Sequence, residues 1–176
     1  MLNTSTTSSL FVDAEMSSEK KDAIGKALGR LASGVFIVTA SDDGLPTGML
    51  ATWVCQASFH PPMVSIAINK ERGILAALKP GSALTVNVLA KNNNDIFKAF
   101  AKPQEPGVDR FSELPLTATQ NNCPAFAAAV SYLECQVQAL AEAGDHVIAL
   151  AQVLHGQLLN ADAEPMVHLR KNGFQY

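Results

Sequence analysis

The chain has 176 residues, of which 48% are hydrophobic and 16% are charged, and its formal net charge at pH 7 is −3. This length suits one domain with a proper core. A negative net charge argues against the basic surface of a nucleic-acid-binding protein and against a polybasic membrane patch. No apolar run reaches the roughly 18–20 residues of a membrane span. We therefore expect no nucleic-acid and no membrane partner.

The cysteines and histidines indicate a reduced protein without a metal centre. The three cysteines are Cys55, Cys123 and Cys135, an odd number with no C-x-x-C spacing, which argues against a disulfide framework and a zinc site. The four histidines show no ligand spacing. We therefore predict a protein of the reducing cytoplasm with no bound metal.

The N-terminal residues predict a tail followed by one helix. Residues 1–16 lack the basic and apolar regions of a signal peptide, so we interpret them as a disordered tail in front of a single domain at 17–176. Ser17 or Ser18 is placed to cap a helix, which we expect Gly34 to break. The apolar face of this helix consists of Ile24, Ala27, Leu28 and Leu31.

Six extended stretches predict a mainly β fold. The first, 35–40, is rich in β-branched residues, and Asp43-Gly44 is a strong hairpin turn signal. The return strand lies in the stretch 48–62, which ends in the double proline Pro61-Pro62 that stops it. Strands in this order, with only short helices between them, are typical of an antiparallel barrel. The remaining strands are expected at 63–68, 83–89, 131–140 and 146–158, and the short helices at 74–78 and after Asn93 or Asn94.

The stretch 131–140 alternates between two sets of residues, which predicts a strand buried on one face only. The face expected in the core carries Leu133, Cys135, Val137 and Ala139. The opposite face carries Tyr132, Glu134, Gln136 and Gln138.

The return strand offers the first candidate site. Small polar side chains and accessible backbone follow one another along it, and two cations, Lys70 and Arg72, come soon after the next strand. Hydroxyl groups, an amide and backbone N–H groups suit a flat ligand with polar edges, and the cations suit its phosphate. The alternative is that these are ordinary strand residues and a solvated turn. The candidate residues on the strand are Thr52, Cys55, Gln56, Ala57 and Ser58.

Two further motifs stand outside this strand. Gly144-Asp145-His146 places a histidine beside a tight turn, where it can hydrogen-bond a ligand edge and titrate near neutrality, or merely satisfy the turn backbone. Arg110, in Asp109-Arg110-Phe111, lies in a long loop at 102–115 and can meet a phosphate, although a surface role is the simpler interpretation.

Taken in order, these segments resemble the flavin reductase-like family of FMN-binding split barrels. The resemblance covers roughly 24–160 and is strongest to the flavin reductase module of cyanobacterial flavodiiron proteins. This chain is thus either a free-standing relative or an excised module. The segments that carry the resemblance are Ala32–Thr39, Cys55–Pro62, Asn87-Val88-Leu89, Asp109-Arg110-Phe111, Leu133-Glu134-Cys135 and Gly144-Asp145-His146.

The resemblance implies a six-stranded antiparallel Greek-key split β-barrel with short flanking helices, which forms a homodimer with FMN at the subunit interface. The phosphate is then expected near the loop with Lys70 and Arg72, with Arg110 as a further contact, and His146 near the flavin as the catalytic residue. Asn87 also belongs to the implied cofactor site. The implied contacts along the return strand are Leu50, Ala51, Thr52, Trp53, Cys55, Gln56, Ala57 and Ser58.

The implied activity is NAD(P)H-dependent reduction of FMN by hydride transfer from nicotinamide to flavin N5. The electrons then go to free flavin, a flavodiiron-type or other redox partner, or oxygen. Because no G-x-G-x-x-G follows a strand, nicotinamide would bind in a groove over the flavin rather than in a Rossmann site. The alternative is an FMN-binding electron-transfer or docking module without NAD(P)H oxidation. Cys55 stands where the family often has serine, and a thiol is the weaker donor.

Overall fold

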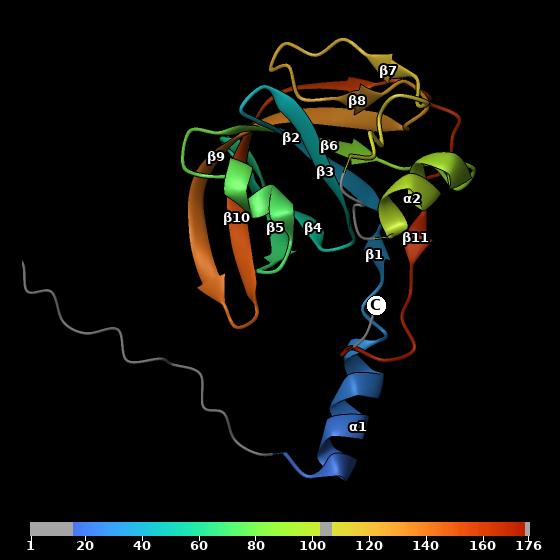
Figure 1. Cartoon of the computed structure of the whole chain (residues 1–176). Coiled ribbons are helices and arrows are strands. Elements are labelled where there is room, and N and C mark those ends of the chain that lie inside the picture. Colours follow the sequence, from blue (N-terminus) through green and yellow to red (C-terminus); the bar gives the residue numbers. More distant parts are fainter. Residues whose placement is uncertain (1–15, 103–106, 175–176) are drawn as a thin grey trace, which may run out of the picture. The chain divides into compact units, whose positions relative to one another are not determined.

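The computed structural model describes residues 16–102 and 107–174. The predicted tail therefore lies outside the described residues except for Met16. The described residues divide into two compact units, one formed by residues 16–31 and 169–174, and the other by those between Ala32 and His168. Figure 1 shows the elements of the chain in order.

The first unit is built around α1 (Ser18–Leu28). Ser17 caps it as expected, because its side chain accepts a hydrogen bond from the backbone N–H of Lys20. The prediction that the apolar face continues to Leu31 was wrong, since the helix ends at Leu28 and Gly29 forms the C-cap. Gly25 is buried against the side chain of Asn172. A Cβ at this position would lie 2.7 Å from that side chain, so the close packing requires glycine.

The second unit holds a seven-stranded antiparallel sheet with the strand order β3-β2-β6-β9-β10-β5-β4. Figure 1 shows β9 and β10 as a long curved hairpin, and these two strands lie in the middle of the strand order. The strands are β2 (Phe36–Asp42), β3 (Leu45–Ala51), β4 (Val54–Phe59), β5 (Pro62–Asn69), β6 (Ala83–Val88), β9 (Ser131–Ala143) and β10 (His146–Leu158).

Short elements flank the sheet. A 3-10 helix, η1 (Gly73–Ala77), follows β5, and α2 (Asn94–Ala101) follows β6. Two pairs of short strands complete the unit: β1 (Ser33–Gly34) with β11 (Val167–His168), and β7 (Leu116–Thr117) with β8 (Ala125–Phe126). Within the described residues, no helix combines the length and the apolar character needed to cross a membrane.

The predicted fold class is confirmed, but the main sheet has seven strands instead of six. The extra strand arises within the stretch 48–62, in which the sequence presents one strand. The structure interrupts it at Thr52 and Trp53, so that β3 pairs with β2 and β4 pairs with β5. This one stretch of sequence thus supplies both edge strands of the sheet, β3 and β4.

Two apolar clusters form the core. The first lies within the curved sheet and contains Ile66, Leu84, Val86 and Val137, each fully buried. The second lies around α2, where Phe100 packs edge-on against Phe111 at 5.3 Å between ring centroids. A buried phenylalanine contributes about 1.5–3 kcal/mol from its removal from water, so this cluster holds α2 firmly against the rest of the unit.

Polar side chains fasten the segment between β7 and β8 to the sheet. Glu134 is buried, and its Oε2 accepts hydrogen bonds from the backbone N–H groups of Gln120 and Asn121 at 2.9 and 2.8 Å. The prediction of a strand buried on one face only was therefore wrong for the first half of β9. Tyr132 and Glu134 are 3% and 2% exposed, whereas Ala139 is exposed.

Candidate functional site

The interruption between β3 and β4 creates the centre of the candidate site. Leu50 and Ala51 end β3, and the carbonyl oxygen of Trp53 accepts a hydrogen bond from the N–H of Ala67 at 3.0 Å, which joins the break to β5. Thr52 is 9% exposed, and its hydroxyl has no hydrogen-bond partner among the described residues. A buried hydroxyl without a partner costs about 1–3 kcal/mol, so this position favours an additional polar group.

Strand β4 presents the predicted polar residues outward at the edge of the sheet. Cys55, Gln56 and Ala57 are exposed, and Ser58 is half-buried. The register against β5 passes from Gln56 to Ser58, so Ala57 is the extra residue of a β-bulge. Among the strands that the structure describes, β4 pairs only with β5, so its other edge carries backbone groups that can meet a ligand or another chain.

His146 lies beside Trp53, although the two come from β10 and from the β3–β4 break. Their ring centroids are 4.9 Å apart with a tilt of 39°. His146 is 7% exposed, and its Nδ1 lies 2.8 Å from Oδ1 of Asp145. A carboxylate can only accept, so Nδ1 carries the proton in this hydrogen bond. The hydrogen bond from His146 lowers the pKa of Asp145, which therefore stays ionised at neutral pH.

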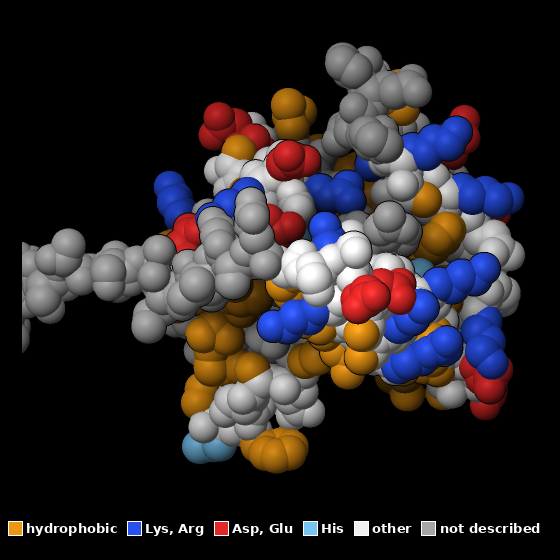
Figure 2. All heavy atoms as spheres, turned by 90° about the horizontal axis from the view of Figure 1, so that it is seen from below, with side chains coloured by type: hydrophobic (Ala, Val, Ile, Leu, Met, Phe, Trp, Pro, Cys, Tyr) orange, Lys and Arg blue, Asp and Glu red, His pale blue; other side chains and the backbone are white. Residues whose placement is uncertain are grey.

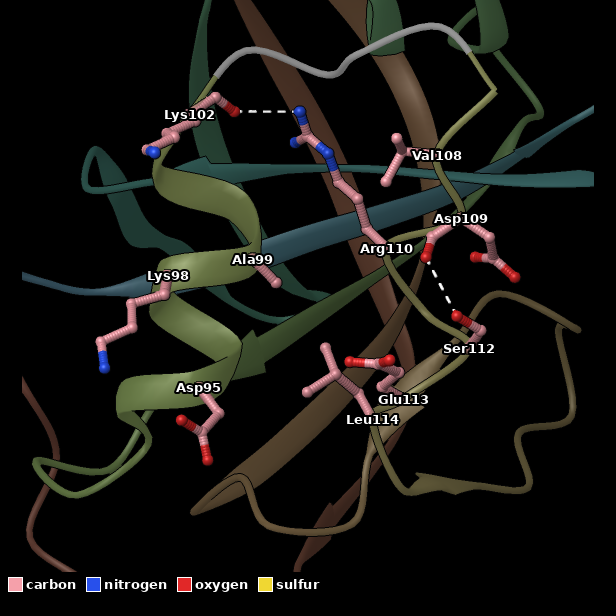
Figure 3. A pocket seen from close by; sticks show the side chains of 10 residues that line it. All are labelled: Asp95, Lys98, Ala99, Lys102, Val108, Asp109, Arg110, Ser112, Glu113 and Leu114. Carbon is pink, nitrogen blue, oxygen red and sulfur yellow. Dashed lines mark hydrogen bonds between the residues drawn. The ribbon is translucent and has the colours of Figure 1, made fainter.

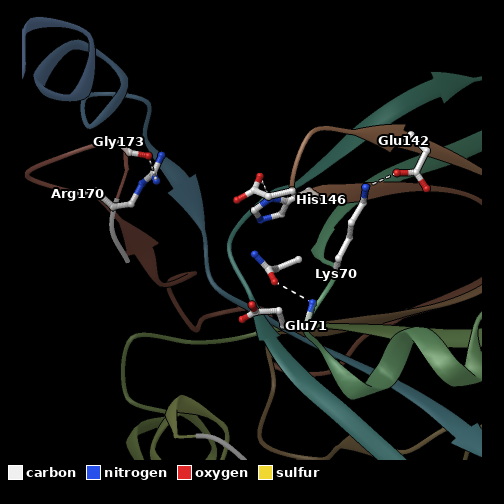
Figure 4. Close-up of polar contacts among 8 residues, drawn as sticks. Lys70, Glu71, Glu142, His146, Arg170 and Gly173 are labelled. Atoms are coloured by element: carbon white, nitrogen blue, oxygen red, sulfur yellow. Dashed lines mark hydrogen bonds and ion pairs between the residues drawn. The ribbon is translucent and has the colours of Figure 1, made fainter. Parts of the chain in front are cut away.

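Lys70 and Arg72 are separated by the turn that follows β5. The ammonium group of Lys70 forms an ion pair with Glu142 near the end of β9, and its backbone N–H donates to the carbonyl oxygen of Asp145 at 3.0 Å. Figure 4 shows Lys70 extended toward Glu142, with His146 on the neighbouring strand. Lys70 thus belongs to the surroundings of Asp145 and His146.

Arg72 and Arg110 instead line a cavity of about 330 Å³ beside β3. Arg110 donates from Nη2 to the carbonyl oxygen of Lys102 at 2.9 Å and lies over the ring of Phe100, 5.7 Å from its centroid. Lys102 lines the same cavity. No sequence pattern pointed to Lys102, because its position there, at the end of α2, depends on how that helix packs (Figure 3).

Asn87 lies apart from these residues in the core. It is fully buried, its Nδ2 donates to the carbonyl oxygens of Ile37 and Pro124, and its Oδ1 accepts from the N–H of Phe126 at 2.9 Å. The amide of Asn87 on β6 therefore links β2, through Ile37, with the residues Pro124 and Phe126 at β8. The contacts of its side chain thus serve the packing of the core.

The three cysteines are free thiols in distinct environments. Cys123 and Cys135 are each 1% exposed, and burial raises their pKa values to about 11 and about 12. Both thus stay protonated and unreactive at neutral pH. Cys55 is the exposed thiol, and it lies on β4 within the candidate site.

Comparisons with known proteins agree with this architecture. The family model described as flavin reductase like domain matches residues 28–175. Diflavin flavoprotein A 1 of Synechocystis is 38% identical over 152 residues, covering 86% of this chain and 26% of that protein. Diflavin flavoprotein A 5 of Nostoc is 38% identical over 154 residues, covering 87% of this chain and 27% of that protein. This chain thus spans about a quarter of the length of these relatives.

Solved structures give the same result. The NADH:FAD oxidoreductase SgcE6 of Streptomyces globisporus is 30% identical, with a TM-score of 0.75, and the match covers 83% of this chain and 86% of that one. The oxidoreductase SMa0793 of Sinorhizobium meliloti is 31% identical with a TM-score of 0.74, covering 82% of this chain and 49% of that one. The resemblance predicted from the sequence is confirmed, and the chain belongs to the flavin reductase like domain family.

Proposed function

We propose that the protein is an NAD(P)H-dependent flavin reductase that uses FMN. Its membership of the flavin reductase like domain family over residues 28–175 carries this proposal. The SgcE6 structures, described as an NADH:FAD oxidoreductase and as its complex with NAD and FAD fragments, support a flavin and a nicotinamide nucleotide as ligands. Both ligands require a site with polar donors along a flat surface and positive charge for phosphate.

The residues around the β3–β4 break fit a flavin. We propose that the ring system lies along Leu50–Ser58, where the Thr52 hydroxyl needs a partner and the bulge at Ala57 turns the exposed edge of β4. Gln56 and Ser58 offer an amide and a hydroxyl as hydrogen-bond partners. The thiol of Cys55 is a weaker donor, so we expect backbone N–H groups to make more of the hydrogen bonds to the flavin. When bound, FMN would accept a hydride at N5 from NAD(P)H and pass electrons to free flavin, a partner protein or oxygen.

His146 is the residue to which we assign the catalytic role. Asp145 fixes the orientation of its ring through the hydrogen bond at Nδ1, which leaves Nε2 to meet a ligand. Lys70 brings a positive charge nearby, since it contributes to the low pKa of Asp145. A ring N–H donor and a cation at this end of the site would stabilise the anion that forms when a flavin is reduced.

A second candidate function is an FMN-binding electron-transfer or docking module that does not itself oxidise NAD(P)H. The length of the relatives favours it, because this chain matches only 26–27% of two diflavin flavoproteins. In such a protein the electrons would come from, or go to, a flavodiiron-type or other redox partner. The cytoplasmic location stays a prediction from the sequence.

The visible spectrum under anaerobic conditions separates these functions. We expect the protein with added FMN to bleach near the flavin absorption maximum when NADPH or NADH is supplied, because hydride transfer removes the oxidised chromophore. Flavin that binds tightly and stays oxidised would support the electron-transfer module. Flavin that does not bind at all would contradict both functions.

We further propose a homodimer with the flavin at its interface. Phe59, Leu154 and Leu158 are 89%, 62% and 64% exposed, and the pairing of Met63 with Gln152 brings the tip of the β4–β5 hairpin next to this part of β10. Exposed apolar side chains on this scale favour burial against a partner. Figure 2 shows one face of the protein on which apolar side chains lie exposed between charged ones.

Replacing Leu154 with glutamate is expected to convert the dimer to monomers, since the interface would then bury a charge without a partner. Sedimentation velocity measures the change. The matched control is Leu45→Glu at the β2–β3 hairpin, where the side chain is 72% exposed and lies on β3, with β2, β6 and β9 between it and β10 in the strand order. A wild-type protein that sediments as a single chain at all concentrations would contradict the dimer.

A further inference from the structure

The ring of His146 is constrained by two neighbours from different parts of the chain. Asp145, in the turn between β9 and β10, accepts the Nδ1 proton at 2.8 Å. Trp53 belongs to the break between β3 and β4, and its indole lies against the imidazole with 4.9 Å between the ring centroids, a separation within the range of aromatic contacts. The hydrogen bond holds one edge of the imidazole, and the indole restricts how the rest of the ring can turn.

Strand β5 sets the spacing between the two rings. The carbonyl oxygen of Trp53 accepts a hydrogen bond from the N–H of Ala67 at 3.0 Å, which places Trp53 beside that position on one edge of β5. His146 pairs with Asn69 on the other edge. Ala67 and Asn69 are two residues apart, and side chains two positions apart point to the same face of a sheet. Trp53 and His146 therefore meet diagonally across β5, on one face.

The two residues that pair with His146 in the sheet serve other purposes. The side chain of Asn69 stabilises the turn after β5, since its Oδ1 accepts a hydrogen bond from the N–H of Glu71 at 2.9 Å. Ala143 of β9 brings only a methyl group. His146 is 7% exposed and Trp53 is half-buried, so their contact is largely shielded from water. The indole is thus well placed to influence the orientation of the imidazole.

We propose that Trp53 is a positioning residue for His146. The indole keeps the imidazole in the orientation in which Nδ1 faces Asp145 and Nε2 can meet a ligand. Without the indole, the imidazole would turn about its Cβ–Cγ bond, and Asp145 would no longer decide which nitrogen carries the proton. This inference rests on the proposed function for the reaction that His146 serves, but not for the orientation of its ring.

Replacing Trp53 with leucine is expected to slow flavin reduction at saturating FMN roughly three- to tenfold, the effect of losing one aromatic contact. Trp53→Phe should bring the rate back to within about twofold of the wild type, because a phenyl ring can take the place of the indole. Stopped-flow absorbance measures the rates. Thermal melts give a temperature at which every variant is folded.

The same change in a His146→Ala protein shows whether Trp53 acts through the histidine. If it does, Trp53→Leu has no further effect once His146 is absent, so the two effects on the rate are not additive. A direct contact of the indole with the flavin, or a general loss of structure, would slow the His146→Ala protein by the same factor as the wild type. Additive effects, or an unchanged rate in Trp53→Leu, would overturn the proposal.

The ¹⁵N NMR signals of the imidazole give a readout that needs neither flavin nor NAD(P)H. Protonated and unprotonated ring nitrogens differ in chemical shift, so we expect the proton of His146 on Nδ1 in the wild type and shared between both nitrogens in Trp53→Leu. The matched control is Tyr132→Leu, which removes the ring next to His155 on the same strand. It should change the signals of His155 and leave those of His146 unchanged.

The two readouts separate this inference from the proposed function. A wild-type protein that reduces no flavin, together with changed His146 signals in Trp53→Leu, would overturn the reductase and support the positioning role. His146 signals that Trp53→Leu leaves unchanged would overturn the positioning role, whatever the rate of flavin reduction.

Discussion

Replacing His146 with alanine is expected to slow flavin reduction by NAD(P)H on the order of a hundredfold, the lower range for loss of a positioned acid–base group. The affinity for FMN should fall far less, because the ring contacts along β4 remain. Stopped-flow absorbance gives the reduction rate, and fluorescence titration gives the dissociation constant. The reason for the split is that His146, oriented by Asp145, contributes a positioned polar group at the reacting end of the flavin and little contact area.

The matched control for His146 is His155→Ala. His155 lies on the same strand but is exposed, and its ring contacts Tyr132 at 6.3 Å between centroids instead of Trp53. It should leave the reduction rate unchanged. A His146→Ala protein that reduces flavin at the wild-type rate would show that His146 only supports the turn at Gly144. A thermal melt of both variants separates a local effect from loss of the fold.

Replacing Asn87 with alanine is expected to lower the free energy of unfolding by about 2–4 kcal/mol, since it leaves the buried N–H of Phe126 without a partner and opens a cavity. For a domain of this size the corresponding fall in Tm is roughly 2–4 °C per kcal/mol. Urea unfolding followed by circular dichroism measures the change.

The same variant decides whether Asn87 belongs to the cofactor site, as the resemblance implies. At a temperature where the variant is folded, its dissociation constant for FMN should equal that of the wild type. Asn92→Ala is the control, because Asn92 is exposed in the turn before α2 and should be neutral in both assays. A selective loss of flavin binding without loss of stability would return Asn87 to the site.

The strands were predictable because β-branched residues favour extended backbone, and because the alternation of apolar and polar residues separates a buried face from an exposed one. The exception is the first half of β9, where Glu134 sits on the polar face yet is buried. Its surroundings come from residues 120 and 121, whose backbone N–H groups cover it. The alternation of residues along a strand depends on the strand's own two faces. It does not indicate whether a distant segment, such as the one with residues 120 and 121, will cover the polar face.

Local motifs of the site were predictable, and its assembly was not. Gly144-Asp145-His146 brings the histidine and its carboxylate partner together within one turn, which the sequence contains in full. The contact of His146 with Trp53 requires β4, β5 and β10 to lie side by side. Lys70 and Arg72 are two positions apart in the sequence, yet the turn after β5 directs one to Glu142 and the other to the cavity with Lys102.

Trp53 is the only tryptophan of the chain, and it lies at the break between β3 and β4. All indole emission therefore originates next to the ring of His146. A chromophore that settles there should quench this signal by energy transfer, without any label or engineered probe. The native protein thus carries its own optical reporter, through which occupancy and reduction of the site can be followed in real time.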